Sequence, residues 1–202
     1  MLPPSDGRLG RGRGGGFPRN PCEIHGVAWV IAVPHNIIGP RQKFDDPYRN
    51  VVSIMANLML QGRPPIIYGD GEQKRCFSHV EDCLSCLVRM GFDSACAREI
   101  IDIGPDEEFV TIRYVAKVLK ALTNFDGEPV HLPPRPQEVR FATCSADKAR
   151  RLLGYRTTAT LHEGLASVVD PIRKVGPRRF RDHLDLEIKT ALTPKTWSER
   201  LF

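Results

Sequence analysis

Polar side chains follow directly on the first long apolar run of this 202-residue chain. The run Val27–Val33 has seven consecutive apolar residues, which is typical of a strand buried on both faces of a parallel sheet. It ends at Pro34, and His35 and Asn36 come next. In open α/β sheets, ligands bind where loops leave the carboxyl ends of the strands. We therefore expect His35 and Asn36 to lie where a ligand binds.

Cysteine and histidine gather between residues 76 and 86, which raises zinc binding as an alternative chemistry. Cys83 and Cys86 are three residues apart on an expected helix, and Cys76 and His79 precede them. However, no second pair follows at the spacing of a zinc finger, and free cysteine is commonly a small core residue. We therefore expect no metal site. The six cysteines show no disulfide-scaffold spacing, which favours a reduced, cytoplasmic protein.

Helical and extended patterns alternate around these residues, as in an α/β fold. Asp46 is expected to cap one helix, and capping boxes at Ser78–Glu81 and Thr160–Glu163 predict two more. The expected helices are 46–61, 79–91, 111–123 and one from 160 towards 169, and the expected short strands are 65–68, 99–103 and 129–132. These elements must position any ligand-binding side chains.

The composition is ordinary for a folded protein, with 41% hydrophobic residues, 26% charged residues and a net charge of +5. The positive excess lies at the two ends, which argues against nucleic acid as a partner of the body. Residues 1–25 are rich in Gly, Arg and Pro and are predicted to be a disordered leader. Its RGRGGG run leaves RNA binding open as a rival function. No apolar run is long enough to span a bilayer, so no membrane partner is expected.

Three segments occur together in an order that resembles one protein family. They read VPHNIIGPRQ from Val33, PIIYGDGEQKRCFSHVED from Pro65 and RPQEVRFATCSADKARRLLGY from Arg135. They resemble the C-terminal half of the NAD-dependent epimerase/dehydratase family, the extended short-chain dehydrogenase/reductases, and especially nucleotide-sugar epimerases similar to UDP-glucose 4-epimerase. The resemblance implies an α/β fold with an incomplete Rossmann sheet and a small α/β substrate-binding domain. It covers residues 26–170, and residues 171–202 are expected to be a tail that packs on the body.

The resemblance also implies a chemistry. Such enzymes move a hydride between a sugar carbon and NAD, so the cofactor carries the reaction while the protein holds the substrate diphosphate. Arg75 and Arg135 resemble the diphosphate-binding arginines of the family, and a guanidinium suits this role because it meets phosphate oxygens in pairs. Asn36 resembles an asparagine that donates to the same diphosphate.

Further positions resemble residues that surround the substrate and the cofactor. Asn50 resembles a substrate-contacting asparagine at a helix start, where phosphate is favoured. Tyr68 resembles a residue bordering the nucleotide base, and Glu138 resembles an acid that meets a ribose hydroxyl. Pro34 and His35 resemble the pair beside the nicotinamide.

Purely structural roles are the alternatives for four of these residues. Arg75 could pair with a nearby carboxylate at the surface, and Arg135 could be solvated between its flanking prolines. Asn36 could be a turn residue and Asn50 a helix cap. The residue types alone do not decide between these roles.

Two features of the family have no counterpart in these 202 residues. The glycines of residues 10–16 follow no apolar strand and precede no helical pattern, so they do not form the glycine-rich NAD turn. None of the four tyrosines is followed by lysine four positions later. The Tyr-x-x-x-Lys pair is therefore missing, and its tyrosine needs that lysine to act as an acid or base at neutral pH.

We therefore predict a chain that supplies the sugar-nucleotide site of an NAD-dependent epimerase or dehydratase and is inactive when isolated. It would be either a truncated frame or a true partial protein. A UDP-sugar is the favoured ligand, and a homologous full-length chain is a candidate partner. The alternative is a non-catalytic module that binds a nucleotide sugar or a partner protein.

Overall fold

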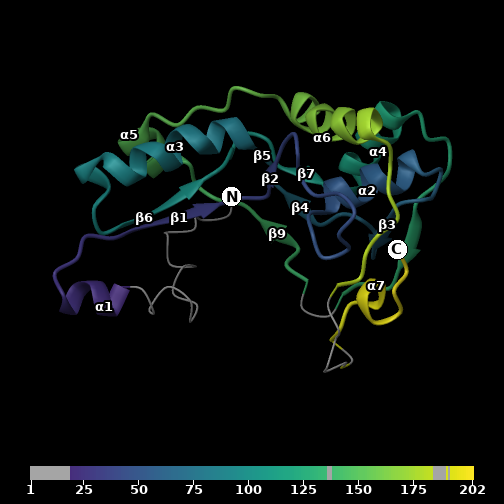
Figure 1. Cartoon of the computed structure of the whole chain (residues 1–202), viewed down its shortest axis with the longest axis horizontal. Coiled ribbons are helices and arrows are strands. Elements are labelled where there is room, and N and C mark those ends of the chain that lie inside the picture. The colour runs from purple at the N-terminus through teal and green to yellow at the C-terminus, as the bar shows by residue number, and fades with distance from the viewer. Residues whose placement is uncertain (1–18, 136–137, 184–189, 191) are drawn as a thin grey trace. The chain divides into compact units, whose positions relative to one another are not determined.

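The computed structural model describes residues 19–135, 138–183, 190 and 192–202. The chain forms two compact units, each assembled from three segments (Figure 1). Unit 1 holds the chain up to residue 37 with residues 76–108 and 143–158, and unit 2 holds residues 38–75, 109–142 and 159–202. Both contain helices and strands, so the predicted α/β class is confirmed. Among the described residues, no helix is both long and apolar enough to cross a bilayer.

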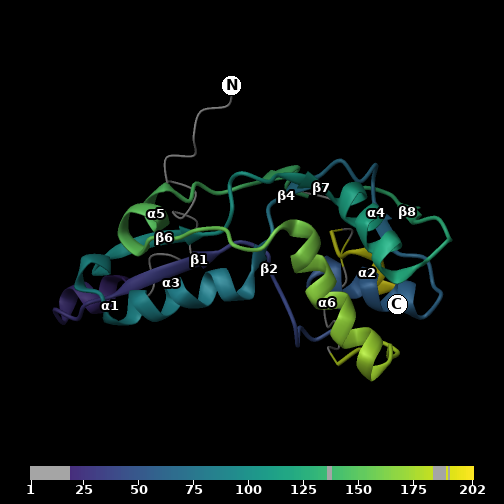
Figure 2. The same ribbon diagram turned by 90° about the horizontal axis from the view of Figure 1, so that it is seen from above.

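Unit 1 is built on two parallel strands, β1 (Val30–Pro34) and β6 (Glu99–Ile103) (Figure 2). They pair over their whole length, from Val30 opposite Glu99 to Pro34 opposite Ile103. Helix α3 (Val80–Phe92) packs against β1, and helix α5 (Asp147–Leu153) packs against β6. The apolar run at residues 27–33 thus forms the predicted parallel strand, which begins three residues later than expected.

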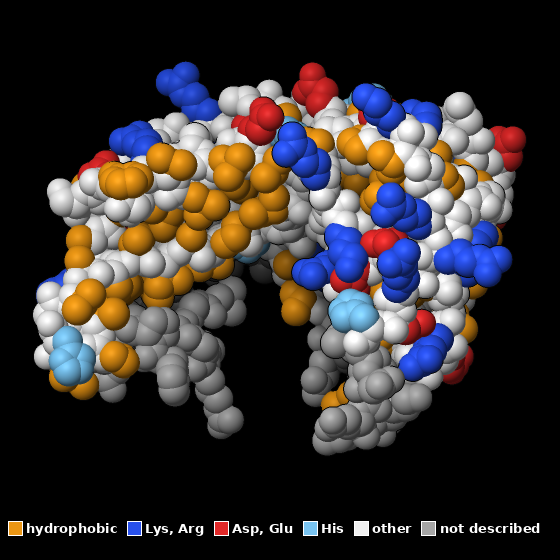
Figure 3. Space-filling model, viewed as in Figure 1, with side chains coloured by type: hydrophobic (Ala, Val, Ile, Leu, Met, Phe, Trp, Pro, Cys, Tyr) orange, Lys and Arg blue, Asp and Glu red, His pale blue; other side chains and the backbone are white. Residues whose placement is uncertain are grey.

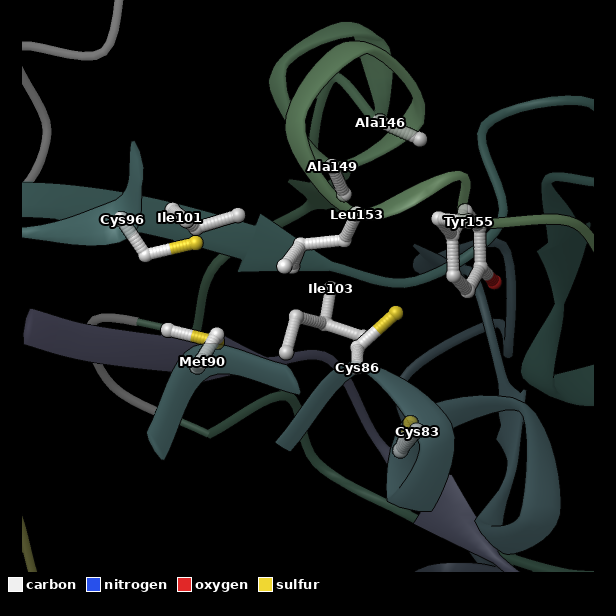
Figure 4. Packing of buried hydrophobic residues seen from close by; sticks show 10 residues of the cluster. All are labelled: Cys83, Cys86, Met90, Cys96, Ile101, Ile103, Ala146, Ala149, Leu153 and Tyr155. Atoms are coloured by element: carbon white, nitrogen blue, oxygen red, sulfur yellow. The ribbon is translucent and has the colours of Figure 1, made fainter. Parts of the chain in front are cut away.

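The core of unit 1 forms where α3, β6 and α5 meet (Figure 4). Its buried side chains are Cys83, Cys86, Met90, Cys96, Ile101, Ile103, Ala146, Ala149, Leu153 and Tyr155. Cys83 and Cys86 were the cysteine pair considered for zinc from sequence alone. They are packed here among apolar side chains, where free cysteine behaves as a small hydrophobe.

Unit 2 contains three helices that pack on one another: α2 (Val51–Leu60), α4 (Ile112–Thr123) and α6 (Leu161–Val175). Strand β3 (Ile66–Tyr68) pairs in parallel with β8 (Val130–Leu132). Strand β4 (Lys74–Arg75) lies between β7 (Val110–Thr111) and β9 (Phe141–Ala142). The remaining short elements are α1 (Arg19–Ile24), β2 (Ile37–Ile38), β5 (Ser78–His79), a 3-10 turn at Ser94–Cys96 and α7 (Lys195–Ser198).

Helix α2 is buried over eight consecutive residues, including the polar Asn57. The Asn57 side chain has no exposed surface. Its Nδ2 donates to the Phe44 carbonyl at 3.0 Å and to the Arg178 carbonyl at 2.8 Å, and its Oδ1 accepts from the Arg178 N–H at 3.0 Å. A buried amide is tolerated because its groups have partners. These bonds fix the C-terminal segment of the chain to α2.

Helix α2 begins later than the sequence pattern predicted. Its N-cap is Asn50, whose Oδ1 accepts from the Val52 N–H at 2.9 Å, so the expected start at Asp46 is wrong. Asp46 instead accepts from the N–H of Tyr48 at 3.0 Å and from Arg49 at 3.0 Å, which closes a separate turn. Local hydrogen bonding by aspartate competes with helix formation, and it prevails here.

One of the two predicted capping boxes is present. At α6, Thr160 accepts from the Glu163 N–H while Glu163 reaches back to the Thr160 N–H, as expected. At α3, no side chain caps the helix, so the capping box predicted at Ser78 is wrong. Ser78 lies in β5, and its hydroxyl donates to the His35 carbonyl at 2.6 Å.

The two ends of the chain also differ from the expectation. The leader was predicted to be disordered to residue 25, and its residues 1–18, with the RGRGGG run, lie outside the described part. Arg19–Ile24 form α1, in which Pro21 occupies the first turn, where no intrahelical N–H bond is lost. At the other end, α6 continues through Pro171 to Val175, because Ile172 is still buried.

We predict that Asn57→Ala lowers the free energy of unfolding by about 2–4 kcal/mol, because the buried N–H and carbonyls of its partners lose their bonds. Chemical denaturation measures this loss. Gln61→Ala is the matched control, since half-buried Gln61 also donates to the Arg178 carbonyl, at 2.9 Å. The control should change the unfolding free energy by less than about 1 kcal/mol. Equal losses in the two variants would contradict the role given to Asn57.

In unit 1, the carboxylate of Asp106 holds the start of α5 in place. Asp106 accepts from the Ala146 N–H at 2.8 Å and from Arg150 Nη1 at 3.0 Å. Burial opposes ionisation of Asp106, but the Arg150 guanidinium and the Ala146 N–H outweigh it and hold the carboxyl pKa below its ordinary 3.8. A depressed carboxyl pKa adds stability that is present above the ordinary pKa and is lost as the pH falls through the lowered one.

We therefore predict that Asp106→Asn destabilises the chain by about 1 kcal/mol at pH 7, since it removes the negative charge that pairs with Arg150 and accepts from the Ala146 N–H. The difference in unfolding free energy between parent and variant should shrink as the pH falls below 3.8. Denaturant titrations between pH 2 and pH 7 measure it. A difference that is constant across this range would refute the assignment.

Candidate functional site

A pocket opens in unit 2 where two parallel strands end. Since β3 and β8 are parallel, with Tyr68 opposite Leu132, the loops that follow them leave from the same edge. The pocket has a volume of about 360 Å³, within the range of small-molecule sites. It is lined by Tyr68, Gly69, Asp70, Gln73, Pro134, Arg135, Glu138 and Arg140. An aromatic ring, an amide, two guanidinium groups and two carboxylates thus converge.

Tyr68 and Arg135 form the centre of this pocket. The Arg135 guanidinium lies over the Tyr68 ring, 4.2 Å from its centroid. The Tyr68 hydroxyl donates to Thr196 Oγ1 at 2.9 Å and accepts from the Thr196 N–H at 2.9 Å, which fixes the ring. Arg135 Nε is buried and has no hydrogen-bond partner among the described residues. A buried, unpaired cationic donor is costly unless a ligand accepts from it.

Glu138 links the pocket to Arg75. Gln73 Nε2 donates to the Tyr68 carbonyl at 3.1 Å and lies 3.5 Å from Glu138 Oε1. Arg75 Nη2 lies 3.9 Å from the same Glu138 oxygen, while its Nη1 donates to the Lys74 carbonyl at 2.7 Å. Arg75 therefore lies beside Glu138 and does not itself line the pocket.

Pro34, His35 and Asn36 end β1 in unit 1. The His35 N–H donates to the Ile103 carbonyl at 2.9 Å, which continues the pairing with β6. His35 Nε2 lies 3.6 Å from Asp102 Oδ1, and this carboxylate, with Cys76, raises the pKa of His35 to about 9. Asn36 has a left-handed backbone with φ of 37°, and its Nδ2 donates to the Cys76 carbonyl at 2.9 Å.

Two cysteines lie near His35, and neither was grouped with it from sequence spacing. Atoms of His35, Cys76 and Cys144 that can ligate a metal all lie within 4.8 Å of one another. The Cys144 thiol donates to the Gly104 carbonyl at 3.7 Å, and its side-chain interaction with Cys76 lowers the pKa of Cys76 and raises that of Cys144. Sixty-eight positions separate the cysteines, and no spacing rule connects them.

The residues suggested by the family resemblance thus fall into three places. Tyr68, Arg135 and Glu138 line the unit 2 pocket, with Arg75 beside them. Pro34, His35 and Asn36 belong to unit 1. Asn50 caps α2, which was the structural role considered for it, and it is not part of the pocket lining. Sequence reasoning missed three polar lining residues: Asp70, Gln73 and Arg140.

Helices combined with parallel strand pairs define the class of the fold, which is α/β. Residues 19–104 match the model of the NAD dependent epimerase/dehydratase family. The resemblance seen in the sequence is therefore confirmed.

Three relatives illustrate the match. A UDP-N-acetyl-alpha-D-glucosaminuronate decarboxylase of Bacillus cytotoxicus is 28% identical over 75% of this chain and 48% of its own length. A UDP-glucose 4-epimerase of Mycolicibacterium smegmatis is 32% identical over 69% of this chain and 44% of its own. The crystal structure of Thermotoga maritima UDP-glucose 4-epimerase with UDP-glucose is 31% identical, with a TM-score of 0.70 over 79% of this chain and 50% of that one. The chain therefore spans about half the length of these relatives.

We predict that Tyr68→Phe lowers the free energy of unfolding by about 1–2 kcal/mol, because the buried Thr196 N–H loses its acceptor. Denaturant unfolding measures this. Tyr114→Phe is the control, since that side chain is 46% exposed. It should change stability by less than about 0.5 kcal/mol. A Tyr68→Phe chain as stable as the control would contradict the anchoring role of this hydroxyl.

Proposed function

We propose that this chain supplies the sugar-nucleotide-binding site of an NAD-dependent epimerase or dehydratase and binds a UDP-sugar in the unit 2 pocket. The observation that carries the proposal is Arg135, whose guanidinium is stacked on Tyr68 while its buried Nε lacks a partner among the described residues. An anionic ligand in the pocket would meet this donor.

The other lining groups fit the remaining parts of a nucleotide sugar. Arg140 adds a second guanidinium, and forked cationic donors suit a diphosphate. Glu138 supplies carboxylate oxygens that accept from ribose hydroxyls. Gln73 donates and accepts, as a base edge or a sugar hydroxyl requires. Asp70 is already engaged in capping the N–H of Glu72 at 2.9 Å.

The relatives support the choice of nucleotide. The names of both curated relatives contain a UDP-sugar, and the Thermotoga structure holds UDP-glucose. They differ in reaction, since one is a decarboxylase and two are epimerases. We therefore propose a UDP-sugar as the ligand of this chain, and we do not choose among the reactions of the family.

NAD dependence is a property of the family, and the described residues alone do not fit the cofactor. β1 leads through His35 into β2, and within the described residues no glycine-rich turn follows it into a helix. The Tyr-x-x-x-Lys pair is also absent from the sequence. We therefore derive no hydride step from this chain and propose that it is inactive when isolated, with Pro34 and His35 contributing at most one side of a nicotinamide site.

A homologous chain is the proposed partner. β1 pairs with β6 alone among the described strands, which leaves an edge open. Helix α3 exposes apolar side chains, and Figure 3 shows hydrophobic groups gathered over this part of the molecule. The exposed apolar side chains of α3 include Leu84, Val88 and Phe92, the last of them 90% exposed. Surfaces of this kind are commonly covered by a further chain.

We predict that Arg135→Ala weakens UDP-glucose binding by about 1.5–3 kcal/mol, the cost of a lost charge-assisted contact, which is roughly 10- to 150-fold in Kd. Arg75→Ala should weaken binding less, because Arg75 lies beside Glu138 and does not line the pocket. Calorimetric titration measures the Kd. Arg173→Ala is the control, because Arg173 is exposed on α6 and pairs with Asp170 at 3.0 Å. Unchanged affinity in both site variants would refute the pocket assignment.

Turnover separates the proposal from a purely binding module. The chain should bind UDP-glucose and leave it unconverted in the presence of NAD. Addition of a full-length homologue lacking its own substrate-site arginine should restore conversion if the chain supplies a working half-site. Binding without any restored conversion would favour the non-catalytic module.

A further inference from the structure

We propose that unit 1 contains a binding site for a thiolate-preferring metal ion, Zn²⁺, formed by His35, Cys76 and Cys144. The proposal is independent of the nucleotide-sugar site, because no ligand residue lines the unit 2 pocket. It also departs from the sequence expectation, which grouped Cys76 with His79, Cys83 and Cys86 and predicted no metal.

The ligand set comes from three separate segments. His35 follows β1, Cys76 lies between β4 and β5, and Cys144 lies between β9 and α5. Their candidate ligand atoms all lie within 4.8 Å of one another. In a tetrahedral site, Zn–S bonds of about 2.3 Å and Zn–N bonds of about 2.0 Å put ligand atoms roughly 3.5–3.8 Å apart. Closure around the ion therefore needs each separation to shorten by about 1.3 Å or less.

The chemistry of the donors suits a soft or borderline ion. Two thiolates neutralise Zn²⁺, and imidazole is a common third ligand. Both cysteines are buried, Cys76 fully and Cys144 at 7% exposure, so the site excludes most water. Three protein ligands leave a fourth position open, as in zinc sites that take water or a further ligand.

Surrounding groups hold two of the three ligands, His35 and Cys76, in place. Asp102 Oδ1 lies 3.6 Å from His35 Nε2, the arrangement in which a carboxylate orients a metal-bound imidazole. Ser78 donates to the His35 carbonyl at 2.6 Å, and Asn36 donates to the Cys76 carbonyl at 2.9 Å. The site therefore has a supporting shell made of residues from the same unit.

Gly104 provides the space in which these segments approach. A Cβ at this position would lie 2.9 Å from Ser78 Oγ, 3.0 Å from His35 Cβ and 3.4 Å from Cys144 Sγ. Any larger residue would push the ligands apart. The three remaining buried cysteines belong to the apolar core instead, and no histidine or carboxylate joins them in a ligand group among the described residues.

Cobalt substitution tests the proposal on the reduced, tag-free 202-residue chain. Co²⁺ should bind with a stoichiometry of one per chain and give thiolate-to-cobalt charge-transfer bands and the strong d–d bands of a tetrahedral ion, and Zn²⁺ should displace it. Cys76→Ser and Cys144→Ser should each remove most of the charge-transfer intensity. Cys86→Ser is the matched control, because Cys86 is equally buried but lies in the core, and it should leave the spectrum unchanged.

Asp102→Asn tests the supporting shell, since loss of such a partner weakens metal binding about 10- to 100-fold while the bands persist. A measurement on the unmodified chain guards against misfolded variants. Zn²⁺ should protect Cys76 and Cys144 from alkylation, as read by peptide mass spectrometry, and leave the labelling of the other cysteines unchanged.

Three outcomes would overturn the proposal. One is a reduced parent chain without cobalt–thiolate bands, and another is a spectrum that survives both serine variants. The third is a chain that forms a Cys76–Cys144 disulfide in air but takes up no cobalt after reduction. UDP-glucose binding is measured on the same samples, so failure of the metal site is distinguishable from failure of the nucleotide-sugar site.

Discussion

The buried amide of Asn57 is the interaction on which the pocket of unit 2 depends. It bonds the backbone of Arg178 on both its N–H and carbonyl sides and so holds the C-terminal segment against α2. The same segment delivers Thr196 to the hydroxyl of Tyr68. Tyr68 in turn presents its ring to Arg135. A buried polar group with satisfied bonds specifies one arrangement, because any other leaves it unpaired.

Strand direction supplies the second constraint. β3 and β8 are parallel, so residues more than sixty positions apart leave the sheet at the same edge and form one pocket. In unit 1, β1 and β6 are also parallel, and their ends bring His35 next to Asp102 and Gly104. The same physical rule therefore builds both the proposed nucleotide-sugar site and the proposed metal site.

Local patterns in the sequence were sufficient for much of the fold. The strand at Glu99–Ile103 and the helix ending at Thr123 are where their apolar periodicities placed them, and the Thr160 capping box is present because its partners are three residues apart. Ser78 failed as a helix cap because its hydroxyl meets the distant His35 carbonyl, which no local rule foresees. The helix start predicted at Asp46 is wrong for the opposite reason. Asp46 accepts from the nearby Tyr48 N–H and so closes a local turn.

The candidate site was only partly predictable for the same reason. Family motifs selected Tyr68, Arg135 and Glu138, which the fold brings together in one lining. Gln73 carries no motif of its own, and its role follows from tertiary contacts with Tyr68 and Glu138. The proximity of Cys144 to His35 and Cys76 could not be predicted, because sequence spacing does not report contacts between distant segments.

The most direct test of the central claim is to titrate the isotopically labelled chain with UDP-glucose and follow its backbone amide NMR signals. We expect saturable shifts at Gly69, Gln73 and Arg135 and unchanged signals in the core of unit 1, such as Ile101. Shifts confined to other residues, or none at millimolar ligand, would contradict the assignment of this pocket as the sugar-nucleotide site.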